Sequence, residues 1–243
     1  MTDKLTTWKR RAGIGLVAGT IALSGTVLAD EAGHDPLEGF NRAMFAVNEG
    51  LDAVAVKPVA QVYDFVTPLP VRAGVGDFFG NIADVRNALN NTLQGKLGDA
   101  ATDLGRLLIN STVGIFGLFD VASELGLEKH DEDFGQTLAV WGWDDSSFVF
   151  WPLVGPKTVR DTGGLIVDIY SDPTWATINK SVAVRNSLVV LRFVDVRADL
   201  LPTDKVVEEA ALDKYAYVRD AYLQRRRNQI FDGRPPRLED VLD

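Results

Sequence analysis

The chain has 243 residues, of which 46% are hydrophobic and 24% are charged, and it carries a formal net charge of −9 at pH 7. That length fits one or two domains and is sufficient to bury a core. The negative charge argues against a nucleic-acid partner, because phosphate backbones are bound by basic faces. It also argues against docking on anionic headgroups, so any contact with a membrane has to come from the burial of apolar side chains.

The first 29 residues are predicted to be a signal peptide. Lys9 to Arg11 form a basic segment, and the residues from Ala12 to Ala29 carry no charge. Cleavage is expected between Ala29 and Asp30, because signal peptidase requires a small residue at the end of the apolar segment. The alternative is a retained membrane anchor, since this segment approaches the length that spans a bilayer.

Three amphipathic helices are predicted in the next part of the chain. Apolar residues recur three or four positions apart in the segments Phe40 to Val54, Phe78 to Leu93 and Leu97 to Leu108. The first helix is expected to end before Lys57 and Pro58, because the residue before a proline avoids the α region. Gly74 and Gly76 are expected to form a turn in front of the second helix.

The segment Asn110 to Leu127 is apolar on most sides. A helix of that kind is either fully buried or in contact with lipid, and the sequence leaves both readings open. The candidate membrane-facing residues are Val113, Ile115, Phe116, Leu118 and Phe119.

An unusually aromatic stretch, WGWDDSSFVFWP, runs from Trp141 to Pro152 and has neither a helical nor a strand period. Three further helices are predicted after it, over Thr158 to Ile169, over Ser187 to Leu201, and from an N-cap near Asp204 to the run Arg225 to Arg227. Residues 232–243 are expected to be a flexible tail. Alternating strand patterns are missing, so the fold class is predicted to be all-α, with a single helical domain over residues 30–231.

A catalytic constellation is not evident. No serine lies in a Gly-x-Ser-x-Gly frame, and the chain has no cysteine and two histidines, His34 and His130. The acidic run from His130 to Asp133 is interpreted as a solvated loop rather than a metal site, because consecutive side chains point in different directions. The run Arg225 to Arg227 is interpreted as a solvated helix end, with phosphate binding as the alternative. We therefore expect no enzyme activity, no cofactor and no metal.

Six segments together closely resemble the MlaA (VacJ) family of outer-membrane phospholipid-transport proteins, and they cover nearly the whole chain after residue 34. They are DPLEGFNRAMFAVNEGLD (35–52), KPVAQVYDFVTPLPVRAGVGDFFGN (57–81), LLINSTVGIFGLFDVAS (107–123), FGQTLAVWGW (134–143), WPLVGPKTVRDTGG (151–164) and YVRDAYLQRR (217–226).

This resemblance implies a ring of amphipathic helices set into the inner leaflet of the outer membrane, on its periplasmic side. Phospholipids would leave the outer leaflet through a channel in the ring and pass to a soluble MlaC-like periplasmic carrier. The resemblance also implies association with a trimeric porin, and chemistry in which no bond is made or broken. The alternative is an adaptor protein that organises porins or carriers without conducting lipid.

One feature departs from the family. Many members carry a lipidated N-terminal cysteine, whereas this sequence contains no cysteine. A thioether-linked lipid anchor is therefore not expected, and attachment to the membrane would depend on the ring and its partners.

The resemblance also implies a hairpin-like loop beside the channel, formed by residues 134–151. We predict one arm with Trp141 and Trp143, a second with Phe148, Phe150 and Trp151, and an acidic tip in water between them. Aromatic rings favour such sites, where an apolar body meets a wet edge. The candidate gate residues are Phe134, Trp141, Trp143, Phe148, Phe150 and Trp151. The alternative is a loop that only packs over the helical core.

Overall fold

The computed structural model describes residues 35–143, 146–173 and 181–236, which belong to the unit Asp35–Asp243. The predicted signal peptide and its cleavage site, Ala29 and Asp30, lie outside the described residues, as do Asp144, Asp145 and residues 237–243. The all-α prediction is confirmed, because helices dominate and the described part contains a single two-stranded sheet. No helix of the described part is both long enough and apolar enough to cross a membrane.

The first helical rod runs without a break through α1 (Glu38–Leu51), the π-helical turn η1 (Asp52–Val56) and α2 (Lys57–Val66). The predicted end before Lys57 and Pro58 is therefore wrong. Proline lacks the N–H that an α-helix needs and its ring crowds the preceding turn, but a π turn widens the backbone there. The rod continues because Pro58 occupies the start of a new α-helical segment.

The second and third predicted helices form a pair, α3 (Leu69–Gln94) and α4 (Leu97–Thr112). Gly95 joins them in the left-handed conformation, with φ of 82°, which ends α3. Gly74 and Gly76 lie inside α3 and not in a turn before it. A Cβ at Gly74 would lie 3.3 Å from the carbonyl oxygen of Leu118, so this glycine permits a close approach of the chain after α4.

A short helix, α5 (Val121–Glu124), precedes α6 (Phe134–Val140), strands β1 (Phe148–Trp151) and β2 (Gly155–Thr158), and α7 (Val159–Ser171). The strands are antiparallel, and Trp151 pairs with Gly155 next to the turn. Helices α6 and α7 touch through their glycines, because a Cβ on Gly164 would lie 2.4 Å from the backbone nitrogen of Gly135.

The C-terminal part consists of α9 (Val182–Ala210) and α10 (Lys214–Ile230). Asp204 does not start the last helix, as was predicted, but lies inside α9 two residues after Pro202. The N-cap of α10 is Asp213, whose carboxylate accepts a hydrogen bond from the Ala216 N–H at 3.2 Å. After α10, the Arg227 guanidinium donates to the Pro236 carbonyl at 2.8 Å, so part of the predicted tail is held against the helix.

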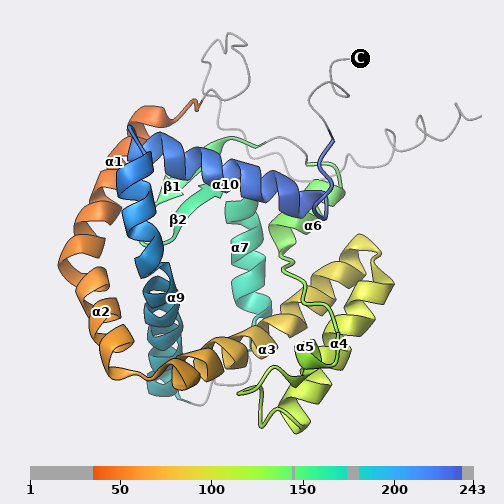
Figure 1. The fold of residues 1–243 in the computed structure, drawn as a ribbon. Helices are drawn as coiled ribbons and strands as arrows, with labels where there is room; N and C mark the ends of the chain where they lie inside the picture. The colour runs from red at the N-terminus through yellow and green to blue at the C-terminus, as the bar shows by residue number, and fades with distance from the viewer. Residues whose placement is uncertain (1–34, 144–145, 174–180, 237–243) are drawn as a thin grey trace, which may run out of the picture. The chain divides into compact units, whose positions relative to one another are not determined.

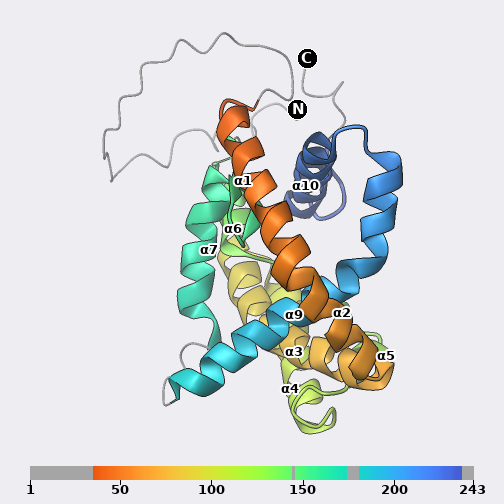
Figure 2. The same cartoon turned by 90° about the vertical axis from the view of Figure 1, so that its left-hand side faces the viewer.

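Contacts between the helices of this unit close a circuit. Helix α9 packs on α3, α3 on α6, α6 on α10, and α10 on α9 (Figure 1). The rod of α1 and α2 lies along the outside of this circuit and crosses α9, with which α2 packs (Figure 2). The arrangement agrees with the ring-like domain that the resemblance implied.

Candidate functional site

Polar side chains occupy the interior of this unit. The largest fully buried side chains among the described residues are all polar: Arg106, Gln136, Asn41, Asn87, Asn90, Asn91, Thr137, Asp84 and Asp103. By contrast, most buried apolar residues are alanines, and the main apolar cluster consists of Phe148, Phe150 and Tyr215 with their partners. A buried polar group and an exposed apolar patch are the informative exceptions in a soluble protein. In the described part of this chain, both buried polar groups and exposed apolar residues are numerous.

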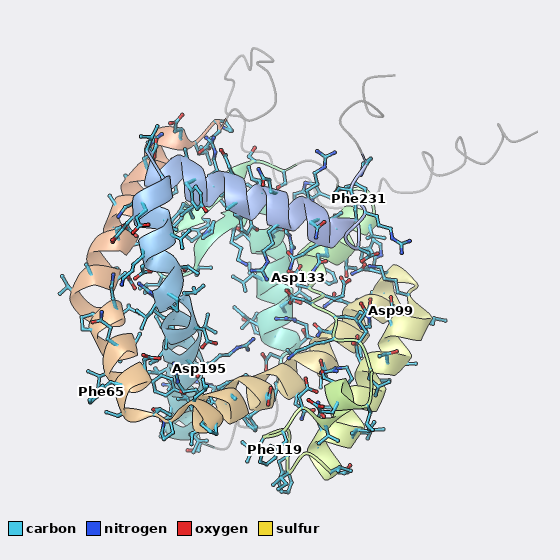
Figure 3. The ribbon with its side chains drawn as sticks, in the orientation of Figure 1. Phe65, Asp99, Phe119, Asp133, Asp195 and Phe231 are labelled. Atoms are coloured by element: carbon cyan, nitrogen blue, oxygen red, sulfur yellow. The ribbon has the colours of Figure 1, made fainter. Side chains whose placement is uncertain are left out.

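The apolar surface is extensive and begins on the first rod. Along α2, the large apolar residues are exposed except the half-buried Tyr63, and Phe65 is 90% exposed. Val56, the last residue of η1, is also half-buried. Phe65 lies at the outer edge of the ribbon in Figure 3. Beside it, α2 and α9 enclose an apolar groove of about 560 Å³, lined mainly by Val59, Val62, Val190 and Leu191.

A second apolar surface lies on the turn that follows α4. The predicted helix is wrong for residues 113–119, because α4 ends at Thr112 and the chain then turns with positive φ at Ile115, Phe116 and Gly117. The backbone turns tightly here: a Cβ at Gly117 would lie 2.6 Å from the Asn81 amide nitrogen.

The five candidate membrane-facing residues are all exposed in this turn, from 43% for Leu118 to 77% for Phe116. The alternative of a buried core helix is therefore wrong. Phe119 lies at the outer edge of the ribbon in Figure 3.

The six candidate gate residues separate into two groups. Phe148 and Phe150 are buried and pack on Tyr215, as expected for residues two positions apart in a strand. Trp141, Trp143 and Trp151 are exposed, and Phe134 is half-buried. The Trp141 indole N–H donates to the Leu93 carbonyl at 3.1 Å, and the Trp151 indole N–H donates to the Thr162 hydroxyl at 2.9 Å.

The hairpin itself differs from the predicted one. Strand β1 pairs with β2, so the second arm is Gly155–Thr158, whereas Trp141 and Trp143 follow the end of α6. The sequence signal for this hairpin was Pro152 and Gly155 directly after an aromatic segment, and in the structure Gly155 takes a φ of 87°. The buried Arg160 in the first turn of α7 holds the segment that follows α6, because its guanidinium donates to the Trp143 carbonyl at 3.1 Å.

A buried ion network joins α10 to α6 and α7. The Arg226 guanidinium donates to both carboxylate oxygens of Asp133 at 2.6 Å and to Asp161 at 2.8 Å. Figure 3 places Asp133 where these helices meet. Gly135 makes room for the network, because a Cβ there would lie 2.5 Å from both Arg226 and Asp161. The interpretation of the arginine run as solvated is therefore wrong for Arg226, which is buried, and right for Arg225, which is exposed.

The pKa values of the two carboxylates record this network. Burial disfavours the charge of Asp161, but the nearby Arg226 charge and hydrogen bonds from Arg226 and Tyr222 outweigh it and lower the pKa to about 2. Burial likewise opposes ionisation of Asp133, and its paired hydrogen bonds with Arg226 still lower its pKa.

A second buried cluster lies between α3 and α4. The Arg106 guanidinium donates to both oxygens of Asp120 at 2.9 Å and lies 3.5 Å from Asp84, whose own oxygens accept no hydrogen bond from the described residues. Burial raises the pKa of Asp84 to about 6, against the opposing charge of Arg106. A polar stripe at spacings of three and four on α3 was the sequence signal for this interior: Asn81, Asp84, Asn87 and Asn91.

The acidic run from His130 to Asp133 lies next to this cluster, and the prediction that it is a solvated loop holds only in part. The His130 ring lies 2.7 Å from an oxygen of the buried Asp103, and Glu132 is buried and accepts from Gln94 at 2.7 Å. Burial raises the pKa of Glu132, although Gln94 and Lys96 oppose this shift. Within the described ranges, no group of three metal-ligating side chains is close enough to hold a metal ion.

Comparisons with known proteins agree with one another. A family model described as "MlaA lipoprotein" matches residues 33–229. An Escherichia coli protein named "Intermembrane phospholipid transport system lipoprotein MlaA" is 34% identical over 218 residues, which are 86% of this chain and 85% of that protein.

An uncharacterized protein of Rickettsia bellii is 33% identical over 198 residues, 81% of this chain and 77% of that one. A solved structure described as "Structural basis for maintenance of bacterial outer membrane lipid asymmetry" superposes with a TM-score of 0.70 at 30% identity, and covers 83% of this chain and 100% of that one.

Proposed function

Because the chain belongs to the MlaA lipoprotein family, whose model matches residues 33–229, we propose that it acts in intermembrane phospholipid transport and thereby maintains outer-membrane lipid asymmetry. In this role it removes phospholipids from the outer leaflet through the ring and passes them to a periplasmic carrier. The role makes and breaks no covalent bond.

The observation that carries the proposal is the inversion of polarity between interior and surface. Large apolar side chains such as Phe65 and Phe116 are exposed, while the largest fully buried side chains are polar. Monomeric soluble proteins rarely expose large contiguous apolar patches, because water drives them inside. Lipid tails remove that drive, and helices then associate through packing and hydrogen bonds. The chain has the surface and the interior that a protein embedded in one leaflet requires.

The two apolar surfaces and the exposed tryptophans have separate parts in this proposal. The turn at residues 113–119 and the outer face of α2 contact acyl chains of the inner leaflet of the outer membrane. The exposed rings of Trp141, Trp143 and Trp151, with Phe134, lie at the edge of the lipid passage, where amphipathic indoles are favoured. Phe148 and Phe150 support this edge from the core with Tyr215 and are not themselves in contact with lipid.

The proposed partners are a trimeric porin and an MlaC-like carrier, and the proposed location is the periplasmic side of the outer membrane after export by a signal peptide. The Escherichia coli relative is named a lipoprotein, but this sequence has no cysteine to carry a thioether lipid. Apolar contacts of the ring therefore supply a larger share of membrane attachment than in lipidated relatives.

The proposal is tested by the lipid content and the membrane association of the full chain. Protein purified in mild detergent is extracted and its phospholipid is measured, and we expect bound phospholipid in wild type. Phe116→Asp is compared with Leu212→Asp, a matched exposed residue on the α9–α10 connection. Aspartate tolerates the positive φ at position 116, so the turn is preserved.

We expect Phe116→Asp to shift the protein from the outer-membrane fraction to the soluble fraction, and Leu212→Asp to leave it in place. Protein without any bound phospholipid, or equal fractionation of the two variants, contradicts the proposal.

A further inference from the structure

Two irregular points of the helices lie close to one pocket. One is the π turn η1 that begins at Asp52, and the other is Pro202 inside α9. The Arg197 guanidinium connects them, because it donates to both oxygens of Asp52 at 2.7 Å and to Asp204 at 2.9 Å. Lys57, in the first turn of α2, also pairs with Asp204 at 2.8 Å. π turns in helices are frequent at functional sites.

The pocket measures about 360 Å³ and is enclosed by the rod of α1 and η1, by α9 and by α10. This volume lies in the range of about 300 to 1,000 Å³ that small-molecule sites occupy. Apolar side chains from all three sides, Phe45, Val207 and Val218, line part of its wall. The remaining wall is charged.

The charges in the wall are not all neutralised by one another. Beyond the network of Asp52, Lys57, Arg197 and Asp204, the wall holds Glu49, Glu208 and Lys214, so four carboxylates face three cations. In the described part of the chain, the Glu49 carboxylate makes no hydrogen bond or ion pair, and Glu208 has only Lys214 at 4.0 Å. Among the residues that the structure describes, the buried Nη1 atom of Arg197 has no hydrogen-bond partner.

Charged side chains of both signs in one pocket favour a ligand of both signs. An ammonium group pairs with the exposed Glu49 and Glu208, and a phosphodiester pairs with Lys214. A purely anionic headgroup is disfavoured, because the pocket wall carries one more negative than positive charge and such a headgroup leaves Glu49 unpaired. We propose that this pocket binds the headgroup of an amine-bearing zwitterionic phospholipid, with the chemistry of phosphatidylethanolamine. The assignment rests on the proposed transport of phospholipid.

The test is the composition of the lipid that purifies with the full chain. Wild type, the double variant Glu49→Gln and Glu208→Gln, and the control Glu124→Gln and Glu128→Gln are purified in the same mild detergent. All four glutamates are exposed, so the fold is retained, and both doubles change the net charge equally. Phosphatidylethanolamine and phosphatidylglycerol bound per protein are compared with their ratio in the source membrane.

We expect wild type and control to be enriched in phosphatidylethanolamine over phosphatidylglycerol. In the pocket variant, the ratio of these two bound lipids should fall about tenfold, which corresponds to about 1.4 kcal/mol of lost discrimination. Bound lipid with the same composition in all three proteins overturns the headgroup assignment and leaves the transport proposal standing. Wild type without any lipid overturns the transport proposal instead. Thermal stabilisation of wild type by soluble glycerophosphoethanolamine, without enrichment of the lipid, assigns the pocket to a soluble phosphodiester and also overturns the headgroup assignment.

Discussion

Replacing Arg226 by methionine removes the cation that holds α10 against α6 and α7. Methionine keeps most of the apolar stem and deletes three short charge-assisted hydrogen bonds, two to Asp133 and one to Asp161. Both carboxylates then stay in a site from which water is largely excluded. The contact of α10 with α6 is one of the four that close the ring, so its loss also weakens the closure.

The magnitude follows from the pKa of Asp161. A fall from the ordinary value of 3.8 to about 2 corresponds to about 2 to 3 kcal/mol at neutral pH, at about 1.4 kcal/mol for each pKa unit. Asp133 adds to this in the same direction. Removing one partner of a buried pair typically costs about 3 to 5 kcal/mol, which agrees. For a chain of this size the melting temperature is expected to fall by about 6 to 20 °C.

The assay is thermal unfolding of the detergent-solubilised protein by circular dichroism, at several pH values. Both carboxylates have lowered pKa values in the folded state, so the stability they contribute is complete above about pH 4 and is lost as the pH falls towards 2. The difference between wild type and Arg226→Met should therefore narrow below pH 4. Arg225→Met is the matched control, because its side chain is 73% exposed and pairs only with an exposed carboxylate, Asp131.

An equal loss of melting temperature in the two arginine variants would refute this reasoning. A loss in Arg226→Met that stays constant down to pH 2 would refute the electrostatic part and leave packing as the cause.

Three further predictions concern the interior. Asp84→Asn is expected to stabilise the protein by up to about 3 kcal/mol at pH 8 and hardly at all at pH 4, because a carboxyl whose folded-state pKa is raised to about 6 costs stability that grows as the pH rises from about 4 to about 6. Chemical denaturation at both pH values checks it, and a gain independent of pH contradicts it. Gly164→Ala should destabilise the protein by about 1 to 3 kcal/mol, because the new Cβ meets the backbone of Gly135. In the control Gly163→Ala, the Cβ meets no described atom within 4 Å, so this variant should be as stable as wild type or more stable. Equal melting temperatures of the two variants would disprove the close approach. Asn41→Ala removes a fully buried amide that accepts from the Phe150 N–H at 2.8 Å and donates to the Phe148 carbonyl at 3.2 Å. This variant should therefore lose at least about 1 kcal/mol more unfolding free energy than Asn48→Ala, which removes a surface contact. A smaller difference, measured from denaturant midpoints, speaks against the strand being fixed by the Asn41 side chain.

Helical periodicity was sufficient to predict the existence of most helices, and the break at Gly95 between α3 and α4 follows from its left-handed conformation. The boundaries that failed share a cause. Pro58 and Pro202 lie inside helices, because a π turn precedes the first and the helix continues past the second. Gly74 serves a close contact with Leu118 and not a turn. The contact of Gly74 depends on a distant part of the chain, and the π turn before Pro58 has no signature in the apolar period, so local pattern does not record either.

The apolar period did not predict which face of each helix is buried. The apolar residues Leu89, Leu93 and Leu104 form helical stripes that would face the core of a soluble protein, yet all three are exposed. Periodicity identifies a stripe but not the medium it faces. Likewise, Arg226 is the buried member of the run Arg225 to Arg227, because Gly135 leaves room for its guanidinium beside Asp133 and Asp161. The run itself does not indicate which arginine is buried.

The central claim is tested most directly by the amount of phospholipid in the outer leaflet of living cells. Aminophospholipid is labelled with a membrane-impermeant amine reagent in a strain that lacks its own copy of this protein, with wild type or Phe116→Asp supplied on a plasmid. The account predicts that wild type lowers the labelled fraction and that Phe116→Asp, produced at the same level, leaves it as high as in the strain without the protein. An unchanged labelled fraction with wild type, or full restoration by Phe116→Asp, would contradict it.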